Sequence, residues 1–338
     1  MSTTDTVRVL RLVSGGVVAR ALYATCKLRV ADVLAGGERD VDELAAACGA
    51  DPDALERYMG LLVGASVFAR DAKGVYSLTT TGQLLRHDVA GSMWSSVVLS
   101  QELLETTPPA AVYALRTGRT AFDHAHPAGP ANLSASLAGD PDADDLFASA
   151  CAAGSAYLVD AVRQAIDWGD VRHIVDVGGN RGAMLTALLA SMPEATGVLF
   201  DQPYVLAAAS PSMVESSAAD RLDCYPGDVF EAVPPGGDLY VLANVLLRWP
   251  PDKAALILRR CREAMARRAR LVVIEPVLDD EGAAPMARVA DLMCFWATGG
   301  RLRSRADWES LLGASGFALD SVTPTTTGWS VIAATPRA

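Results

Sequence analysis

The chain has 338 residues, of which 51% are hydrophobic and 20% are charged, and its formal net charge at pH 7 is −11. A chain of this length and apolar content can form two globular domains with a large core. The negative charge argues against nucleic acid as a partner, and the lack of an uncharged apolar run of about 18 residues argues against a membrane span.

The N-terminal sequence and the cysteines predict a cytoplasmic protein. The first residues, MSTTDTVRVLRLV, lack the basic start and the small-residue cleavage site of a signal peptide. The six cysteines are scattered without a Cys-x-x-Cys pair, which is typical of reduced thiols. His124 and His126 stand close together but have no clear third ligand, so we predict no metal site.

Residues 10–35 are predicted to form a long helix, which Gly15-Gly16 should break or bend. More than one face of this helix is apolar, so it either packs inside its own chain or contacts a second subunit. We expect a homodimer, with ordinary core packing as the alternative.

Residues 41–86 have the pattern of a winged helix. Asp40 and Asp51 can cap two helices, and a third begins at Thr80 or Thr81. The expected helices and strands of this region lie at residues 41–48, 52–64, 67–69 and 75–78. The second helix carries only Arg57 among acidic neighbours, so a dimerisation scaffold is favoured over DNA binding.

The middle of the chain is predicted to be largely helical. Residues 92–118 form two segments, residues 121–130 form a loop, and a long helix from 142 to about 166 connects two domains. The expected division is therefore a dimerisation domain (1–100), linking helices that contribute to a substrate pocket (101–168) and a catalytic domain (169–338).

Residues 173–201 read as a strand, a glycine turn, a helix and a second strand. The first strand is an apolar run typical of a parallel sheet, and the helix runs from Ala183 to about Ser191. Glycines let the backbone approach a ligand, and a helix N-terminus offers free N–H groups. The unit therefore predicts a site for a nucleotide-type ligand.

The spacing of the glycines indicates which ligand. A dinucleotide fingerprint would need glycine where Asn180 and Ala183 stand, and no Gly-Lys-Ser/Thr phosphate loop is present. The pattern Asp-x-Gly-x-x-x-Gly, from Asp176 to Gly182, is the one used for S-adenosylmethionine (SAM). Asp201, about 25 residues after Asp176, can bind both hydroxyls of a ribose. The alternative is a sheet whose glycines only permit tight packing.

The rest of the chain alternates strands and helices, which predicts an α/β sheet with a final strand pair. Strands are expected at residues 222–225, 239–242, 271–275, 318–322 and 330–334, and helices at 251–267, 283–297 and 305–314. Asp228 follows a strand and can bind an adenine amino group, although a simple polar turn is the alternative. Glu275 ends another strand.

The segments DVGGNRG, LFDQ, GDVF, LLRW and IEP together resemble the SAM-dependent small-molecule O-methyltransferases of the caffeate and hydroxyneurosporene type. The LLRW form is similar to bacterial members that modify anthracyclines and polyketides. The resemblance covers nearly the whole chain. It implies a Rossmann-like SAM-binding domain, a mostly helical winged-helix dimerisation domain, an intertwined homodimer and a substrate pocket between the domains. With the glycine motif, it gives a cofactor site of Asp176, Gly178, Gly179, Asp201, Gln202, Asp228, Val229 and Ala243.

The chain departs from this family where many relatives carry a catalytic base. Leu247 and Arg248 replace a His-Asp pair, and Leu302 replaces the glutamate that orients the histidine. Glu275 is retained as a catalytic candidate, with a purely structural role as the alternative. Catalysis would then depend on positioning and on Arg248, which can stabilise an anionic acceptor or simply be a surface residue.

The expected function is methyl transfer from SAM to an aromatic or polyketide-like small molecule. The candidates for lining the acceptor site, with core packing as the alternative for each, are Trp94, Phe147, Cys151, Arg248, Met293 and Trp296. One rival is a SAM-binding enzyme that does not transfer methyl, and another is a winged-helix regulator that senses a small molecule.

Overall fold

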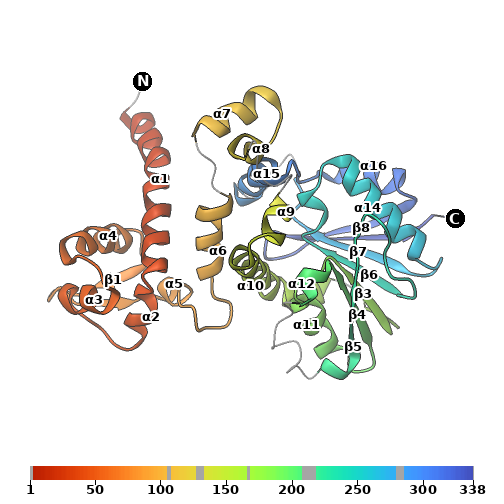
Figure 1. Ribbon diagram of the computed structural model, residues 1–338, viewed down its shortest axis with the longest axis horizontal. Coiled ribbons are helices and arrows are strands. Elements are labelled where there is room, and N and C mark those ends of the chain that lie inside the picture. Colours follow the sequence, from red (N-terminus) through yellow and green to blue (C-terminus); the bar gives the residue numbers. More distant parts are fainter. Residues whose placement is uncertain are drawn as a thin grey trace. The chain divides into compact units, whose positions relative to one another are not determined.

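The computed structural model describes residues 3–104, 108–126, 133–165, 168–207, 218–278 and 285–337 (Figure 1). It divides into two compact units, Met1–Glu105 and Thr106–Ala338. Most of the segment expected to link two domains, residues 101–168, belongs to the second unit.

The first unit begins with a helix that continues through its two glycines. Helix α1 (Thr3–Lys27) is unbroken, so the bend expected at Gly15-Gly16 is wrong. A glycine destabilises a helix by only about 1 kcal/mol relative to alanine, which the favourable residues of the neighbouring turns can offset. The break comes instead at Arg29, whose left-handed backbone (φ 57°) precedes helix α2 (Val30–Ala35).

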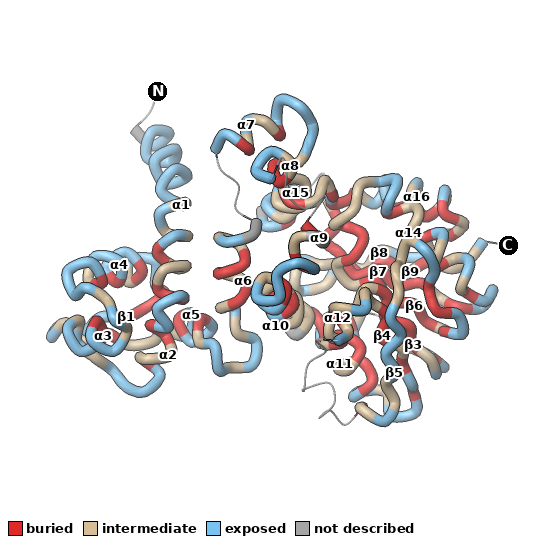
Figure 2. Tube along the Cα trace, viewed as in Figure 1, coloured by how far each residue is buried: buried red, intermediate tan, exposed pale blue. Residues whose placement is uncertain are grey.

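Much of α1 is exposed within its own unit, as the pale tube of Figure 2 shows. Leu10, Leu12 and Val13 are between 62% and 75% exposed. By length and composition α1 also meets the requirements of a membrane-spanning helix, as core helices of soluble proteins do. Exposed apolar surface of this extent is typical of a contact with another molecule.

The rest of the first unit confirms the predicted winged-helix pattern. Its elements are α3 (Val41–Cys48), α4 (Pro52–Gly64), β1 (Phe68–Arg70), β2 (Tyr76–Leu78), α5 (Thr80–Gln83), α6 (Trp94–Leu99) and a π-helical turn, η1 (Ser100–Leu104). Asp40 and Asp51 cap α3 and α4 as expected, each accepting a backbone N–H bond of 2.9 Å. Strands β1 and β2 pair antiparallel.

The second unit contains a sheet with seven strands among the described residues, in the order β5-β4-β3-β6-β7-β9-β8. The strands are β3 (His173–Val177), β4 (Thr196–Asp201), β5 (Leu222–Pro226), β6 (Leu239–Ala243), β7 (Arg270–Glu275), β8 (Phe317–Pro324) and β9 (Ser330–Pro336). The first five are parallel, and the last two form an antiparallel pair. This confirms the α/β, Rossmann-like class.

The strand order places a ligand site. The chain moves outward from β3 through β4 to β5 and then returns to β6 on the other side of β3. Loops that leave β3 and β6 therefore diverge, and open α/β sheets bind ligands at such a switch point, beyond the carboxyl ends of the strands.

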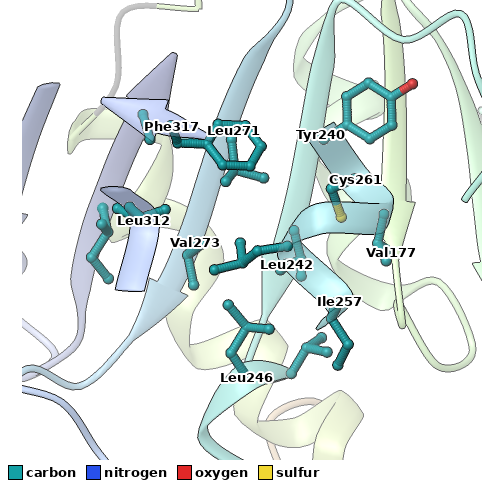
Figure 3. Close-up of a cluster of buried hydrophobic side chains, with 14 of the residues drawn as sticks. Val177, Tyr240, Leu242, Leu246, Ile257, Cys261, Leu271, Val273, Leu312 and Phe317 are labelled. Atoms are coloured by element: carbon teal, nitrogen blue, oxygen red, sulfur yellow. The ribbon is translucent and has the colours of Figure 1, made fainter. Parts of the chain in front are cut away.

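Apolar side chains cover both faces of the sheet, as parallel strands require. On one face Val177, Leu242 and Val273 pack against helices α14 (Pro251–Ala264) and α16 (Arg305–Ala314). Figure 3 shows this cluster, in which Leu246 continues the apolar contacts beyond the end of β6. On the other face a second cluster joins α10 (Pro141–Ala165) and α11 (Ala183–Ser191) to the sheet.

The remaining helices correct two predicted boundaries. They are α7 (Pro108–Thr117), α8 (Ala121–Ala125), α9 (Leu133–Ala138), α12 (Pro203–Ala207), α15 (Pro285–Thr298) and the 3-10 turns η2 (Ala219–Arg221) and η3 (Leu246–Arg248). The loop expected at residues 121–130 begins as helix α8, because the Thr120 hydroxyl caps it; residues 127–130 lie outside the described part. Helix α14 ends at Ala264 and not at residue 267. The next residue, Met265, has left the helical conformation and is buried in the core.

Candidate functional site

The glycine loop after β3 is built from left-handed backbone. Gly178, Asn180 and Gly182 have φ angles of 69°, 56° and 79°. The Gly178 N–H donates to the Phe200 carbonyl at 2.8 Å, which ties the loop to β4. A Cβ atom on Gly179 would collide with the Asp176 carboxylate and lie 2.6 Å from Leu199. The loop therefore passes close over Asp176, and only glycine fits at residue 179.

Arg181 fixes the far side of the same loop. Its guanidinium pairs with Asp144 at 3.3 Å and with Asp145, both on α10. No motif in the sequence indicates this contact, because the partners of Arg181 lie more than 30 residues away.

Asp201, at the end of β4, accepts two backbone hydrogen bonds, one of them from the glycine loop. Its carboxylate accepts from the Asn180 N–H at 2.8 Å and from the Gln202 N–H at 2.7 Å. Burial raises the pKa of Asp201, while these two hydrogen bonds oppose the shift. A carboxylate has about four acceptor positions, so two remain for the hydroxyl groups of a ligand.

Asp176 is a buried carboxylate with no hydrogen-bond partner among the described residues. Asp176 is 1% exposed, and neither oxygen accepts a hydrogen bond of good geometry, although the Leu185 N–H lies close enough to affect its pKa. Burial, followed by repulsion from Asp201, raises the pKa of Asp176 to about 7, against a weaker opposing effect of the Leu185 N–H. A buried polar group without a partner is costly and often marks where a ligand completes the site.

Replacing Asp176 by asparagine should change how stability depends on pH. The folded pKa of about 7 exceeds the ordinary value of 3.8, so the folded state holds a proton that the unfolded state has lost between these values. The free energy of unfolding should therefore fall as pH rises from about 4 to 7 and then level off. From pH 5 to pH 8, the wild type should lose about 2–3 kcal/mol more than Asp176→Asn. Urea unfolding of the ligand-free protein at the two pH values measures this, and parallel losses would refute it.

The loops after β5 and β6 lie beside this region along the sheet. The Asp228 carboxylate accepts the Phe230 N–H at 2.8 Å within its own turn. A shallow hollow of about 220 Å³ is lined by Phe200, Tyr225, Gly227, Asp228, Glu231, Ala232, Val233, Pro234 and Pro235. Val229 packs against the core cluster of Figure 3, and Ala243 packs against the cluster on the other face.

Asn244, which follows Ala243, was not predicted as part of the site. Its backbone is left-handed (φ 56°), and its side-chain oxygen accepts from the Trp329 indole N–H at 2.7 Å. A Cβ atom on Gly178 would approach Val245 at 3.1 Å, so this turn also borders the glycine loop.

Glu275 holds the η3 loop through its backbone. Its carboxylate is fully buried and accepts the Leu247 N–H at 2.8 Å. Arg303 lies 3.9 Å from the other carboxylate oxygen and donates to the carbonyls of Leu246 and Trp249. Burial raises the pKa of Glu275 to about 7, and the Arg303 charge opposes the shift. This geometry favours the structural alternative for Glu275. Arg303 is buried and lies 57 residues after Leu246 in the sequence, and no motif indicates this contact.

Leu247 and Leu302 lie together, although 55 positions separate them. Both are buried in one apolar cluster with Ala287, and Cys294 packs against it. Gly300 lies directly against the backbone of residues 247 and 248, so a Cβ atom there would collide with it. The two positions where relatives were expected to carry a base and its partner are therefore neighbours and apolar here.

Arg248 contacts two of the residues that were predicted to line the acceptor site. Its guanidinium donates to the Cys151 sulfur at 3.1 Å and lies over the Phe147 ring, 4.7 Å from its centre. Burial alone would lower the pKa of Arg248, but the neighbouring Cys151 sulfur reverses this, with smaller effects from Cys294 and Asp201, so that the pKa is raised.

The other predicted acceptor residues have different surroundings. Trp296 packs against a small cluster of Ala110, Ala114 and Ala121. Met293 lies on the same helix, α15, and is half-buried. Trp94 belongs to the first unit, where its indole N–H donates to the Cys26 carbonyl at 2.8 Å. Roles for these three side chains stay predictions.

The two histidines considered as metal ligands stack on different aromatic rings. His124 stacks on Tyr113 and His126 on Phe122, with ring centres 4.5 and 4.2 Å apart. Within the described ranges, no group of three or more His, Cys, Asp or Glu side chains could hold a metal ion.

Comparisons with known proteins cover both units. A sequence model of the O-methyltransferase domain matches residues 110–318, and one of the O-methyltransferase dimerisation domain matches residues 10–88. The phenazine O-methyltransferase PhzM of Lysobacter antibioticus is 33% identical, over 97% of this chain and 95% of that protein. The phenazine-1-carboxylate N-methyltransferase of Pseudomonas aeruginosa is 32% identical, over 93% and 92%. The crystal structure of CalO1, a methyltransferase in calicheamicin biosynthesis with S-adenosylhomocysteine (SAH) bound, is 30% identical with a TM-score of 0.84, over 99% of each chain.

Proposed function

Because this chain belongs to the O-methyltransferase family and its cofactor is SAM, we propose that it transfers the SAM methyl group to an aromatic or polyketide-like small molecule in secondary metabolism. The observation that carries the proposal is the pair of carboxylates, Asp176 and Asp201, around the glycine loop at the switch point of the sheet. An oxygen acceptor is favoured by the family model, while the relatives include both O- and N-methyltransferases.

The residues around the glycine loop fit this cofactor. Asp201 keeps free acceptor positions for ribose hydroxyls, and Gly179 lets the loop pass close over Asp176. The unpartnered Asp176 carboxylate suits a ligand that carries positive charge and N–H donors, as SAM does. We assign the cofactor to these residues together with Gly178, Gln202, Asp228, Val229 and Ala243.

The bound cofactor supplies a methyl group on a sulfonium, which any well-aligned nucleophile can accept. Leu247 and Leu302 cannot take a proton, and one Glu275 oxygen is engaged by the loop backbone while the other lies 3.9 Å from Arg303. The chain's contribution is therefore to orient the acceptor and exclude water, which can lower a barrier by several kcal/mol. The acceptor has to lose its proton through its own acidity.

Product analysis tests the proposed function against its rival. The protein is incubated with SAM and a panel of hydroxylated and aminated aromatic compounds. Gain of one methyl group with an equal amount of SAH supports the proposal, and the position of the methyl group separates O- from N-transfer. An acceptor that is hydroxylated or decarboxylated without gaining methyl would establish the non-methylating alternative.

Turnover at saturating SAM should rise with pH through the pKa of the acceptor's own hydroxyl group. A histidine base would instead give an inflection near ~6.5, whatever the acceptor. The measurement is a kcat profile with two acceptors whose pKa values differ by about two units. An inflection near pH 7 with both would reveal an enzyme group, and Glu275 would be the first residue to replace.

The protein should be a homodimer, in which the exposed face of α1 is covered by the second subunit. We also propose that it works in the cytoplasm with no nucleic-acid or membrane partner. Light scattering at micromolar concentration checks the subunit number. A mass near 35.4 kDa, that of a single chain, would contradict a dimer.

A further inference from the structure

Arg248 is held in place before any acceptor arrives. Its backbone belongs to the loop that Glu275 and Arg303 fix, and Gly300 lies against that backbone. Cys151 accepts one N–H of the guanidinium, and Phe147 covers one of its faces. A side chain fixed on one edge and one face loses little freedom when a ligand binds its remaining edge.

The charge of Arg248 has no carboxylate partner among the described residues. The buried arginine nearby, Arg303, has Glu275 at 3.9 Å, and Arg181 has Asp144 and Asp145. Arg248 instead has a thiol, while Asp201 and Glu275 act on it only from a distance. A guanidinium has five N–H donors, of which these residues use one. Arg248 is partly buried, so water does not fully hydrate its charge, and a negatively charged ligand would complete the site.

We propose that Arg248 binds a carboxylate group of the acceptor, so that the substrates of this enzyme are aromatic acids. This rests on the proposed methyl transfer and names its substrate class. A carboxylate matches the planar edge of a guanidinium with two parallel hydrogen bonds. A carboxylate is also ionised above about pH 5, whereas a phenol with an ordinary pKa ionises only near about pH 10. A phosphate would bring a second negative charge towards Asp201 and is therefore disfavoured.

Calorimetry in the presence of SAH tests this without requiring methyl transfer. The probes are 2-hydroxybenzoate, 2-hydroxy-1-naphthoate and 3-hydroxyanthracene-2-carboxylate, which are hydroxylated aromatic acids of one, two and three rings, each with its methyl ester. At least one acid should bind the wild type at least 10-fold more tightly than its ester. Arg248→Gln should lose that preference, and Arg248→Lys should keep only part of it because lysine lacks the planar fork.

A matched control is Arg259→Gln, which removes an exposed arginine from α14 and should leave the preference unchanged. Each variant must bind SAH like the wild type, which shows that its fold is intact. Esters that bind as well as acids, an acid preference that survives Arg248→Gln, or failure of all three acids to bind would overturn the proposal. If acids bind through Arg248 but never gain methyl, the proposed function fails and the anion site stands.

Discussion

Replacing Asp201 by alanine should weaken SAM binding about 10- to 100-fold without unfolding the protein. Hydrogen bonds to a charged group contribute about 1.5–3 kcal/mol, and the variant would lose those to the ribose. It would also release the Asn180 N–H, which the carboxylate now holds at 2.8 Å, so the glycine loop would keep only its Gly178–Phe200 hydrogen bond to β4. Both effects act in the same direction.

Calorimetry with SAM measures this loss, and circular dichroism confirms the fold. Asp223→Ala is the matched control, because Asp223 is an exposed carboxylate on the neighbouring strand β5, paired in register with Val198. It should bind SAM like the wild type. Unchanged affinity in a folded Asp201→Ala variant would mean that the cofactor does not contact this carboxylate.

Replacing Gly179 by alanine should remove measurable SAM binding and also destabilise the protein by about 1–3 kcal/mol. The new methyl group would collide with Asp176 and lie 2.6 Å from Leu199. Neither neighbour can move away freely, because Asp176 is on β3 and Leu199 is packed in the core between β4 and α11. The loop must shift instead, and it carries the backbone on which the cofactor would lie.

The control for this variant is Gly154→Ala in helix α10, where an added Cβ atom meets nothing within 4 Å. That change should stabilise the protein by about 0.5–1 kcal/mol, because alanine favours helix. Thermal unfolding and SAM calorimetry on both variants give the comparison. Normal binding by a folded Gly179→Ala variant would show that the loop has more room than its backbone indicates.

The sequence was sufficient for the parts of the fold that local patterns determine. Strand β3 and the glycine turn were predicted because an apolar run followed by glycines has few other solutions. The caps at Asp40 and Asp51 were predicted because capping needs only residues three positions apart. The bend expected at Gly15-Gly16 failed because glycine weakens a helix without ending it.

In the site, too, residues that follow local patterns could be predicted, and residues that act over a long sequence distance could not. Asp176 and Asp201 could be placed because they lie at or next to the carboxyl ends of β3 and β4, and the carboxyl ends of parallel strands meet at one edge. Arg303, Gly300 and Trp329 could not, because each acts on a loop more than 50 residues away. Phe147, Cys151 and Arg248 were predicted separately as acceptor residues, and only the fold shows that the three are in contact.

The apolar contact of Leu247 with Leu302 has a consequence for how sequences of this family can diverge. Relatives are expected to carry a histidine and a glutamate at these positions, which would support each other by a hydrogen bond. Exchanging only one leucine would bury a polar group without its partner, at a cost of about 1–3 kcal/mol. A protein that changes from the Leu–Leu pair to the His–Glu pair by one substitution at a time therefore passes through a less stable variant, so the two residues should change together. We expect members of the family to fall into two discrete groups at these positions, with few mixed pairs between them.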